Sequence, residues 1–162
     1  MGNVMTVARR ELGVFFNSTL FWVLATAFML FGGLLFNLYI QSPSAQANMM
    51  PLLSLYGTVL LFVTPLMAMR LLAEEQRSGT LELLMTSPVQ DWQVVMGKWL
   101  GALLALLSMM ALTLSHVFVM SRLSEKGLAL GPTLSSYMGL VLLCAALLAL
   151  GVLTSSVTET QG

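Results

Sequence analysis

The sequence has few charged residues and a single cysteine. Only 9% of its 162 residues are charged, while 57% are hydrophobic. Soluble domains usually carry about 25% charged residues, and a chain of this length cannot bury so much apolar surface in a core. A bilayer can surround that surface instead. With Cys144 as the only cysteine, an internal disulfide and a cysteine-based metal site are both excluded.

Several functional patterns are also missing. The formal net charge is zero, so no basic field indicates nucleic-acid binding. No Gly-x-x-x-x-Gly-Lys-Ser/Thr motif occurs, so ATP is not bound by this chain. We find no nucleophile–base pair and no metal-ligand spacing. The thirteen methionines are typical of flexible fillers in membrane helices. We therefore expect no catalytic centre, no metal and no cofactor.

Four apolar stretches have no charged residue in their middle. A helix needs about 20 residues to cross the hydrocarbon core, and only a helix satisfies its own backbone there. We therefore predict an all-α membrane protein with a single transmembrane domain over residues 1–162 and spans at residues 20–40, 52–72, 99–120 and 134–154.

The basic residues are distributed unevenly between the two ends of these spans. Five lie before the first span or around the connection 73–98, namely Arg9, Arg10, Arg70, Arg77 and Lys98. Only Arg122 and Lys126 follow the third span. The positive-inside rule then predicts a cytoplasmic N-terminus, central segment and C-terminus.

Residues 4–16 have the pattern of an amphipathic helix. One face carries Val4, Val7, Ala8, Leu12, Phe15 and Phe16, and the other carries Thr6, Arg9, Arg10 and Gly13. This pattern predicts an interfacial helix with its arginines toward anionic headgroups. Glu11, at the edge of the apolar face, either reaches water or an arginine, or contacts another helix. Residues 17–19 break this helix and can cap the next one.

Three features inside the spans have a physical consequence. Pro65 removes a backbone hydrogen bond and is expected to kink the second span. Small residues spaced by four allow a neighbouring helix to approach closely, and they occur at Gly97, Gly101 and Ala105. His116 is the one intramembrane residue that titrates near neutrality, and we favour an interfacial or helix-bonded role over a proton relay.

The connection 73–98 is predicted to form a helical elbow. Ser78-Gly79 ends the second span's helix, Thr80 caps a short helix, and Ser87-Pro88 starts the helix of the third span. The short helix carries the apolar residues Leu81, Leu83, Leu84 and Met85. Such an exposed cluster favours docking of a partner. The alternative is a hairpin packed against its own spans.

This segment resembles the first cytoplasmic loop of type-2 ATP-binding-cassette (ABC) permeases, and is similar to the permeases of gliding motility and nitrous-oxide-reductase maturation. The resemblance rests on a Glu-Glu-x-x-x-Gly-Thr-x-Glu-x-x-x-x-x-Pro pattern over residues 74–88. It extends to Arg10-Glu11-Leu12, to Gly97-Lys98 and to the segment 151–159, and so covers most of the chain.

The resemblance implies a multi-pass permease subunit of an ABC exporter in the bacterial inner membrane. Its partners would be a cytoplasmic ATPase subunit, which binds the ATP, and a second permease subunit in a homo- or heterodimer. The contacts to the ATPase would fall on Glu74, Glu75, Gly79, Thr80, Leu81, Glu82, Leu83, Leu84 and Pro88, and the membrane-interface contacts on Arg9, Arg10 and Glu11.

Family members usually have six spans, so we expect two C-terminal spans to be lacking here. A rival hypothesis is a non-transport scaffold or regulator with four helices, whose loop binds another cytoplasmic protein. A neighbouring ATPase gene would favour the transporter.

Overall fold

Helices make up nearly all of the described part of the chain. The computed structural model describes residues 2–41, 48–78, 91–124 and 128–158, and the side chains of residues 4–41, 48–69, 92–124 and 128–153. Its helices are α1 (Gly2–Phe16), α2 (Thr19–Ile40), α3 (Met50–Ser78), α5 (Asp91–Leu112), α6 (Leu114–Leu123) and α7 (Leu130–Thr158). No strand occurs in these ranges, and the predicted all-α class is confirmed.

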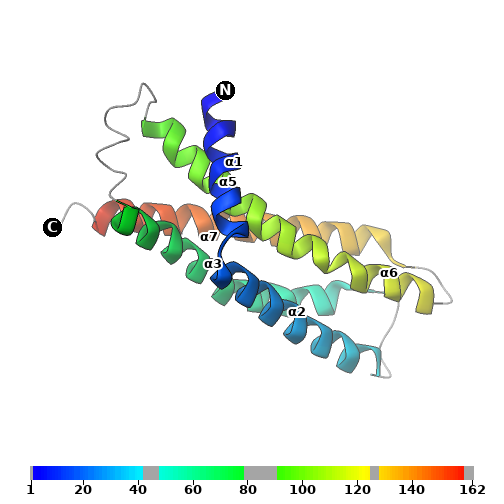
Figure 1. Ribbon diagram of the computed structural model, residues 1–162. Coiled ribbons are helices and arrows are strands. Elements are labelled where there is room, and N and C mark those ends of the chain that lie inside the picture. The colour runs from blue at the N-terminus through cyan, green and yellow to red at the C-terminus, as the bar shows by residue number, and fades with distance from the viewer. Residues whose placement is uncertain (1, 42–47, 79–90, 125–127, 159–162) are drawn as a thin grey trace.

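Four stretches of these helices are long and apolar enough to cross a membrane: Thr19–Ile40, Met50–Met69, Trp92–Leu123 and Leu130–Leu153. The third stretch joins α5 and α6. The four stretches lie side by side along one long direction, and α1 runs across them (Figure 1). The ends of α3 and α7 and the beginning of α5 lie near one end of this bundle, called here the α1 end. The end of α2 and the end of α6 lie at the opposite end, called here the far end.

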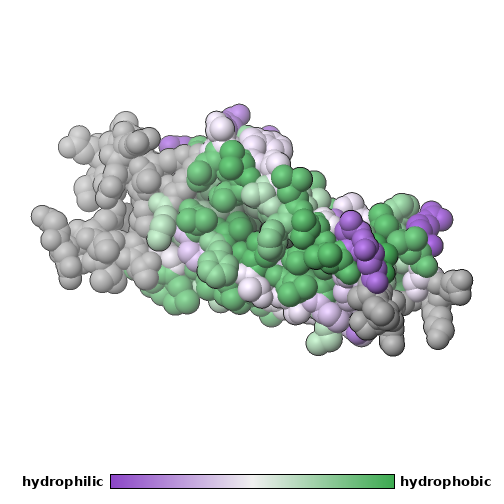
Figure 2. All heavy atoms as spheres, turned by 90° about the horizontal axis from the view of Figure 1, so that it is seen from below, coloured by the Kyte–Doolittle hydropathy of each residue, from purple (hydrophilic) through white to green (hydrophobic). Residues whose placement is uncertain are grey.

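Apolar side chains cover the sides of the bundle. Large residues such as Leu30, Phe62, Met138 and Leu142 are exposed, and Figure 2 shows hydrophobic side chains over the middle of the face in view. Hydrophilic side chains gather there mainly toward the far end. Lipid chains are as apolar as leucine, so this surface is stable only where a bilayer covers it.

The helices α3 and α7 pack closely along their length. An ideal Cβ on Gly57 would lie 3.0 Å from a methyl of Leu140, and one on Gly151 would lie 2.5 Å from the Ala68 Cβ. From the first contact to the second, the residue numbers rise in both helices, so α3 and α7 run parallel. Between these contacts, the Thr64 hydroxyl lies 3.9 Å from the Cys144 sulfur. Small residues therefore bring these two backbones together.

Single side chains tie the remaining helices to this pair. Trp99 of α5 donates its indole N–H to the Ala145 carbonyl of α7 over 3.1 Å. At the far end, Tyr39 of α2 donates to the Asn48 carbonyl over 2.6 Å. Asn48 in turn accepts the N–H of Met50 at the start of α3. These bonds fix the depth of neighbouring spans relative to one another.

The structure differs from the sequence predictions in local detail. The third predicted span is divided at Thr113, between α5 and α6. Ser18 is the N-cap of α2, but its side chain makes no capping hydrogen bond. Pro65 lies inside α3, which continues to Ser78, and the kink expected there stays a prediction. A proline removes one N–H donor, and the other backbone bonds of a long apolar helix hold it together.

Candidate functional site

Most residues of the predicted coupling segment lie outside the described residues. These are Gly79, Thr80, Leu81, Glu82, Leu83, Leu84 and Pro88. Glu74 and Glu75 lie in the last turns of α3, which ends at Ser78, and α5 begins at Asp91. Both helix ends lie at the α1 end of the bundle (Figure 1). The two helices that flank the predicted coupling segment therefore have their near ends on the same side of the bundle.

The helix α1 is docked against the beginning of α5. An ideal Cβ on Gly97 would lie 2.6 Å from the Val7 Cβ and 3.1 Å from the Val4 carbonyl oxygen. An ideal Cβ on Gly101 would lie 2.6 Å from the Glu11 Cβ and 3.0 Å from the Ala8 carbonyl oxygen. The predicted row of small residues does receive a neighbouring helix. That neighbour is α1, which crosses the bundle, and not another membrane span.

This crossing also places the three predicted interface residues. Glu11 is half-buried, and its Cβ faces Gly101. The contact with another helix, one of the two readings left open by the sequence, is therefore present. Arg9 and Arg10 are exposed, whereas Ala8 and Phe15 are buried. The apolar face of α1 is thus used largely for contact with protein.

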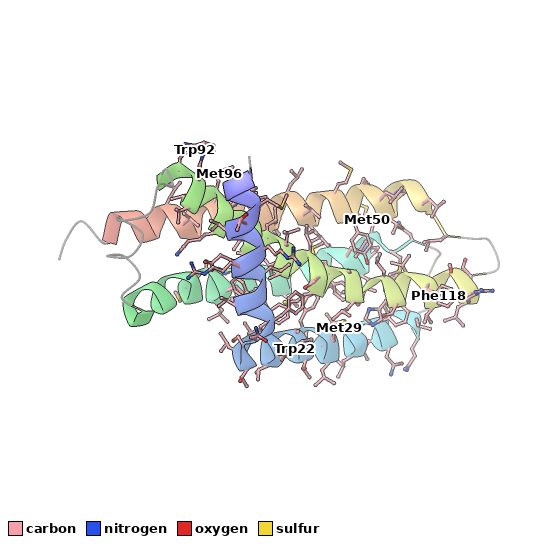
Figure 3. The ribbon with its side chains drawn as sticks, turned by 45° about the horizontal axis from the view of Figure 1, so that its top comes forward. Trp22, Met29, Met50, Trp92, Met96 and Phe118 are labelled. Atoms are coloured by element: carbon pink, nitrogen blue, oxygen red, sulfur yellow. The ribbon has the colours of Figure 1, made fainter. Side chains whose placement is uncertain are left out.

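Aromatic residues surround the corner between α1 and α2. Trp22 donates its indole N–H to the carbonyl of Phe16, the last residue of α1, over 2.8 Å. The rings of Phe15 and Phe16 meet the Phe21 ring edge-on, at centroid distances of 6.4 Å and 5.1 Å. Figure 3 shows Trp22 near one end of α1 and Trp92 near the other. Tryptophans concentrate at the headgroup level of membranes, so this arrangement suits a helix lying in the interface.

A second group of polar side chains lies inside the bundle. Tyr56 of α3 is only 1% exposed, and its hydroxyl donates to the Gly32 carbonyl of α2 over 3.1 Å. The same oxygen lies 3.1 Å from Nδ1 of His116 in α6. The predicted helix-bonded role of His116 matches this contact. The sequence pointed to His116 but not to Tyr56, because a tyrosine in an apolar run gives no pairing signal.

Thr113 and Tyr137 form a neighbouring polar pair. The Thr113 hydroxyl donates to the Met110 carbonyl over 2.6 Å and lies 2.9 Å from the Tyr137 hydroxyl. Because the Thr113 proton goes to Met110, Tyr137 is the donor in this pair. The break between α5 and α6 is therefore linked to α7.

Neither polar group has the composition of a metal site. No group of three or more His, Cys, Asp or Glu side chains able to hold a metal occurs among the described residues. Cys144 is a free, buried thiol. What the interior offers is hydroxyl, imidazole and backbone carbonyl groups that join helices.

Comparison with models of protein families identifies a match. A family model described as "ABC-2 family transporter protein" matches residues 5–162. The match includes most of α1, all the apolar stretches and the segment between α3 and α5. No curated protein sequence matches the chain.

Proposed function

Because the chain belongs to the ABC-2 transporter family and is a membrane subunit of an ABC transporter, we propose that it is an exporter permease driven by a separate ATPase. The ATPase docks on the segment 73–98. The family match over nearly the whole chain carries this proposal, together with the position of the ends of α3 and α5 at the α1 end of the bundle.

The proposed docking surface is the short leucine-rich stretch of this segment. Leu81, Leu83 and Leu84 supply apolar packing against a groove of the ATPase, and Glu82 supplies a polar anchor. Glu74 and Glu75 brace the end of α3. A few apolar anchors surrounded by polar groups are the usual energetic centre of a protein interface.

Force reaches the membrane through the two helices that flank the segment. The beginning of α5 is in backbone-close contact with α1 at Gly97 and Gly101. A displacement of α5 therefore moves α1 with it, since close-packed backbones cannot slide without separating. The aromatic corner at Phe16 and Trp22 passes this movement to α2.

The proposed orientation places the α1 end in the cytoplasm of a bacterial inner membrane. The helices at this end carry Arg9, Arg10, Arg70, Arg77 and Lys98, whereas Arg122 lies in the last turn of α6. Arg9 and Arg10 are exposed, as contact with anionic headgroups requires. A second permease subunit completes the transporter.

The test is co-purification of the membrane protein with its ATPase. Leu83→Asp and Glu82→Lys are expected to abolish the complex, because each puts an uncompensated charge into the docking surface. The matched control is Leu130→Asp, since Leu130 is exposed at the start of α7, away from the α1 end. Unchanged co-purification of both loop variants would contradict the docking assignment. If the loop variants fail to insert into the membrane while Leu130→Asp inserts normally, the assignment of residues 73–98 to a solvent-exposed segment would be contradicted.

A further inference from the structure

The third span is divided at Thr113 without a glycine or proline nearby. The Thr113 N–H donates to the Met110 carbonyl over 3.0 Å, and the His116 N–H donates to the Thr113 carbonyl over 3.0 Å. Both bonds join residues three apart, whereas the regular α-helix joins residues four apart. The Thr113 hydroxyl adds a second bond to the Met110 carbonyl. Such back-bonding by threonine bends helices, so the break is built from hydrogen bonds of the helix itself.

Beyond this break, and among the residues that the structure describes, one polar side chain of α6 links it to the rest of the bundle. Nδ1 of His116 lies 3.1 Å from the Tyr56 hydroxyl, and its ring packs on Phe36 with a centroid distance of 4.7 Å. The Tyr56 proton goes to the Gly32 carbonyl. Nδ1 of His116 is then the donor to Tyr56. One imidazole thus holds α6 to both α2 and α3.

Most of the remaining surface of α6 faces away from the bundle. Leu114, Phe118, Val119 and Leu123 are exposed, and Figure 3 shows Phe118 at the far end of the molecule. Met120 is buried, and Val117 packs against the core. Lipid replaces such apolar contacts at little cost. The His116–Tyr56 hydrogen bond therefore adds a specific preference for the docked position to the packing of Met120 and Val117.

The break itself is attached to a helix other than α6. Thr113 is buried and bonded to Tyr137 of α7, and this bond does not involve any residue of α6. The two polar groups therefore have different roles. The Thr113–Tyr137 pair fixes the pivot, and the His116–Tyr56 pair fixes the position of the segment beyond it.

We propose that α6 is a separately moving segment that pivots at Thr113 and is latched by the hydrogen bond between His116 and Tyr56. Release of the latch swings α6 away from α2 and α3 and opens the far end of the bundle. This inference rests on the proposed transport function for its purpose, but the movement itself is a property of this chain alone.

The experiment measures distances between spin labels in lipid nanodiscs by pulsed electron resonance. Labels are placed at Leu34→Cys in α2 and Leu123→Cys in α6, both exposed positions, in a Cys144→Ser background. A reference pair joins Leu34→Cys to Leu55→Cys of α3. Tyr56→Phe removes only the latch oxygen, and His116→Phe keeps a ring against Phe36. The matched control is Tyr39→Phe, which removes a tyrosine hydroxyl bonded to the Asn48 carbonyl.

Both latch variants are expected to increase the population of molecules with a second, longer distance between the labels on α2 and α6. The ratio of open to closed populations should rise roughly threefold to tenfold, the effect of losing one hydrogen bond within a membrane. The reference pair and the Tyr39→Phe control should match the parent. An unchanged α2–α6 distribution in both variants would overturn the proposal, as would an equal change in the reference pair.

The same measurement separates this inference from the proposed function, because it needs no ATPase and no substrate. Suppose that the latch variants lengthen the α2–α6 distance but the chain does not co-purify with an ATPase. The movement of α6 would then be established, and its role in transport would be contradicted. If instead the chain binds the ATPase and the α2–α6 distance does not change in the latch variants, the latch proposal would be contradicted and the proposed function would stand.

Discussion

Glu11 and Gly101 meet where α1 crosses α5, so closely that a Cβ on the glycine would stand 2.6 Å from the Cβ of the glutamate. The neighbouring Ala8 is fully buried, and its carbonyl oxygen lies 3.0 Å from the same point. A helix that crosses a membrane bundle is thus held by backbone proximity. Its attachment depends on the absence of a side chain at Gly97 and Gly101 of α5.

The first prediction concerns this crossing. Gly101→Ala should displace α1, because the added methyl meets both a Cβ and a carbonyl oxygen of that helix. Overpacking of this kind costs about 1–3 kcal/mol. Hydrogen exchange followed by mass spectrometry should show faster exchange over residues 2–16, while α7 stays protected.

The control for this change is Gly139→Ala, since nothing lies within 4 Å of a Cβ at Gly139. Alanine is favoured over glycine inside a helix by about 0.5–1 kcal/mol, so this variant should be neutral or more stable. Equal exchange over residues 2–16 in both alanine variants would argue against the close approach of α1 and α5.

The second prediction concerns the parallel pair α3 and α7. Gly151→Ala should destabilise the protein in detergent by about 1–3 kcal/mol, because its methyl would lie 2.5 Å from the Ala68 Cβ. Ala68→Gly in the same chain should restore part of this loss by removing the opposing methyl. Unfolding titrations of the two single variants and the double variant give the coupling energy directly.

A coupling energy near zero would contradict this contact, because two substitutions that do not share a contact add their effects. Ala68→Gly alone should be mildly destabilising, by about 0.5–1 kcal/mol, since glycine weakens a helix interior.

The third prediction concerns the link between α5 and α7. Trp99→Phe removes the indole N–H that reaches the Ala145 carbonyl over 3.1 Å. The loss should be about 0.5–1.5 kcal/mol of unfolding free energy. The ring of phenylalanine keeps most of the apolar contact, so the change isolates the hydrogen bond.

Trp22→Phe serves as its comparison, because the Trp22 bond to the Phe16 carbonyl is exposed and local. We expect Trp99→Phe to lower the melting temperature in detergent more than Trp22→Phe does. The reverse order would mean that the corner between α1 and α2 stabilises the bundle more than the link between α5 and α7.

Much of the fold could be predicted from the sequence. The uncharged stretches predicted four spans, and the pattern of residues 4–16 predicted a separate N-terminal helix. The spacing of Gly97 and Gly101 predicted a close helix contact. The pairing of Tyr56 with His116 and of Thr113 with Tyr137 could not be predicted. Polar residues inside an apolar run show no periodicity from which a partner on another helix can be identified.

The sequence by itself determined that these stretches are helices and that a bilayer surrounds them, because long uncharged stretches have no other way to satisfy their backbone in lipid. Only the tertiary structure decided that α1 occupies the glycines of α5, that α3 and α7 run as a close parallel pair, and that α6 is set apart by Thr113. In a span where almost every residue is apolar, hydrophobicity does not distinguish the side facing protein from the side facing lipid. Shape and a few hydrogen bonds make that distinction.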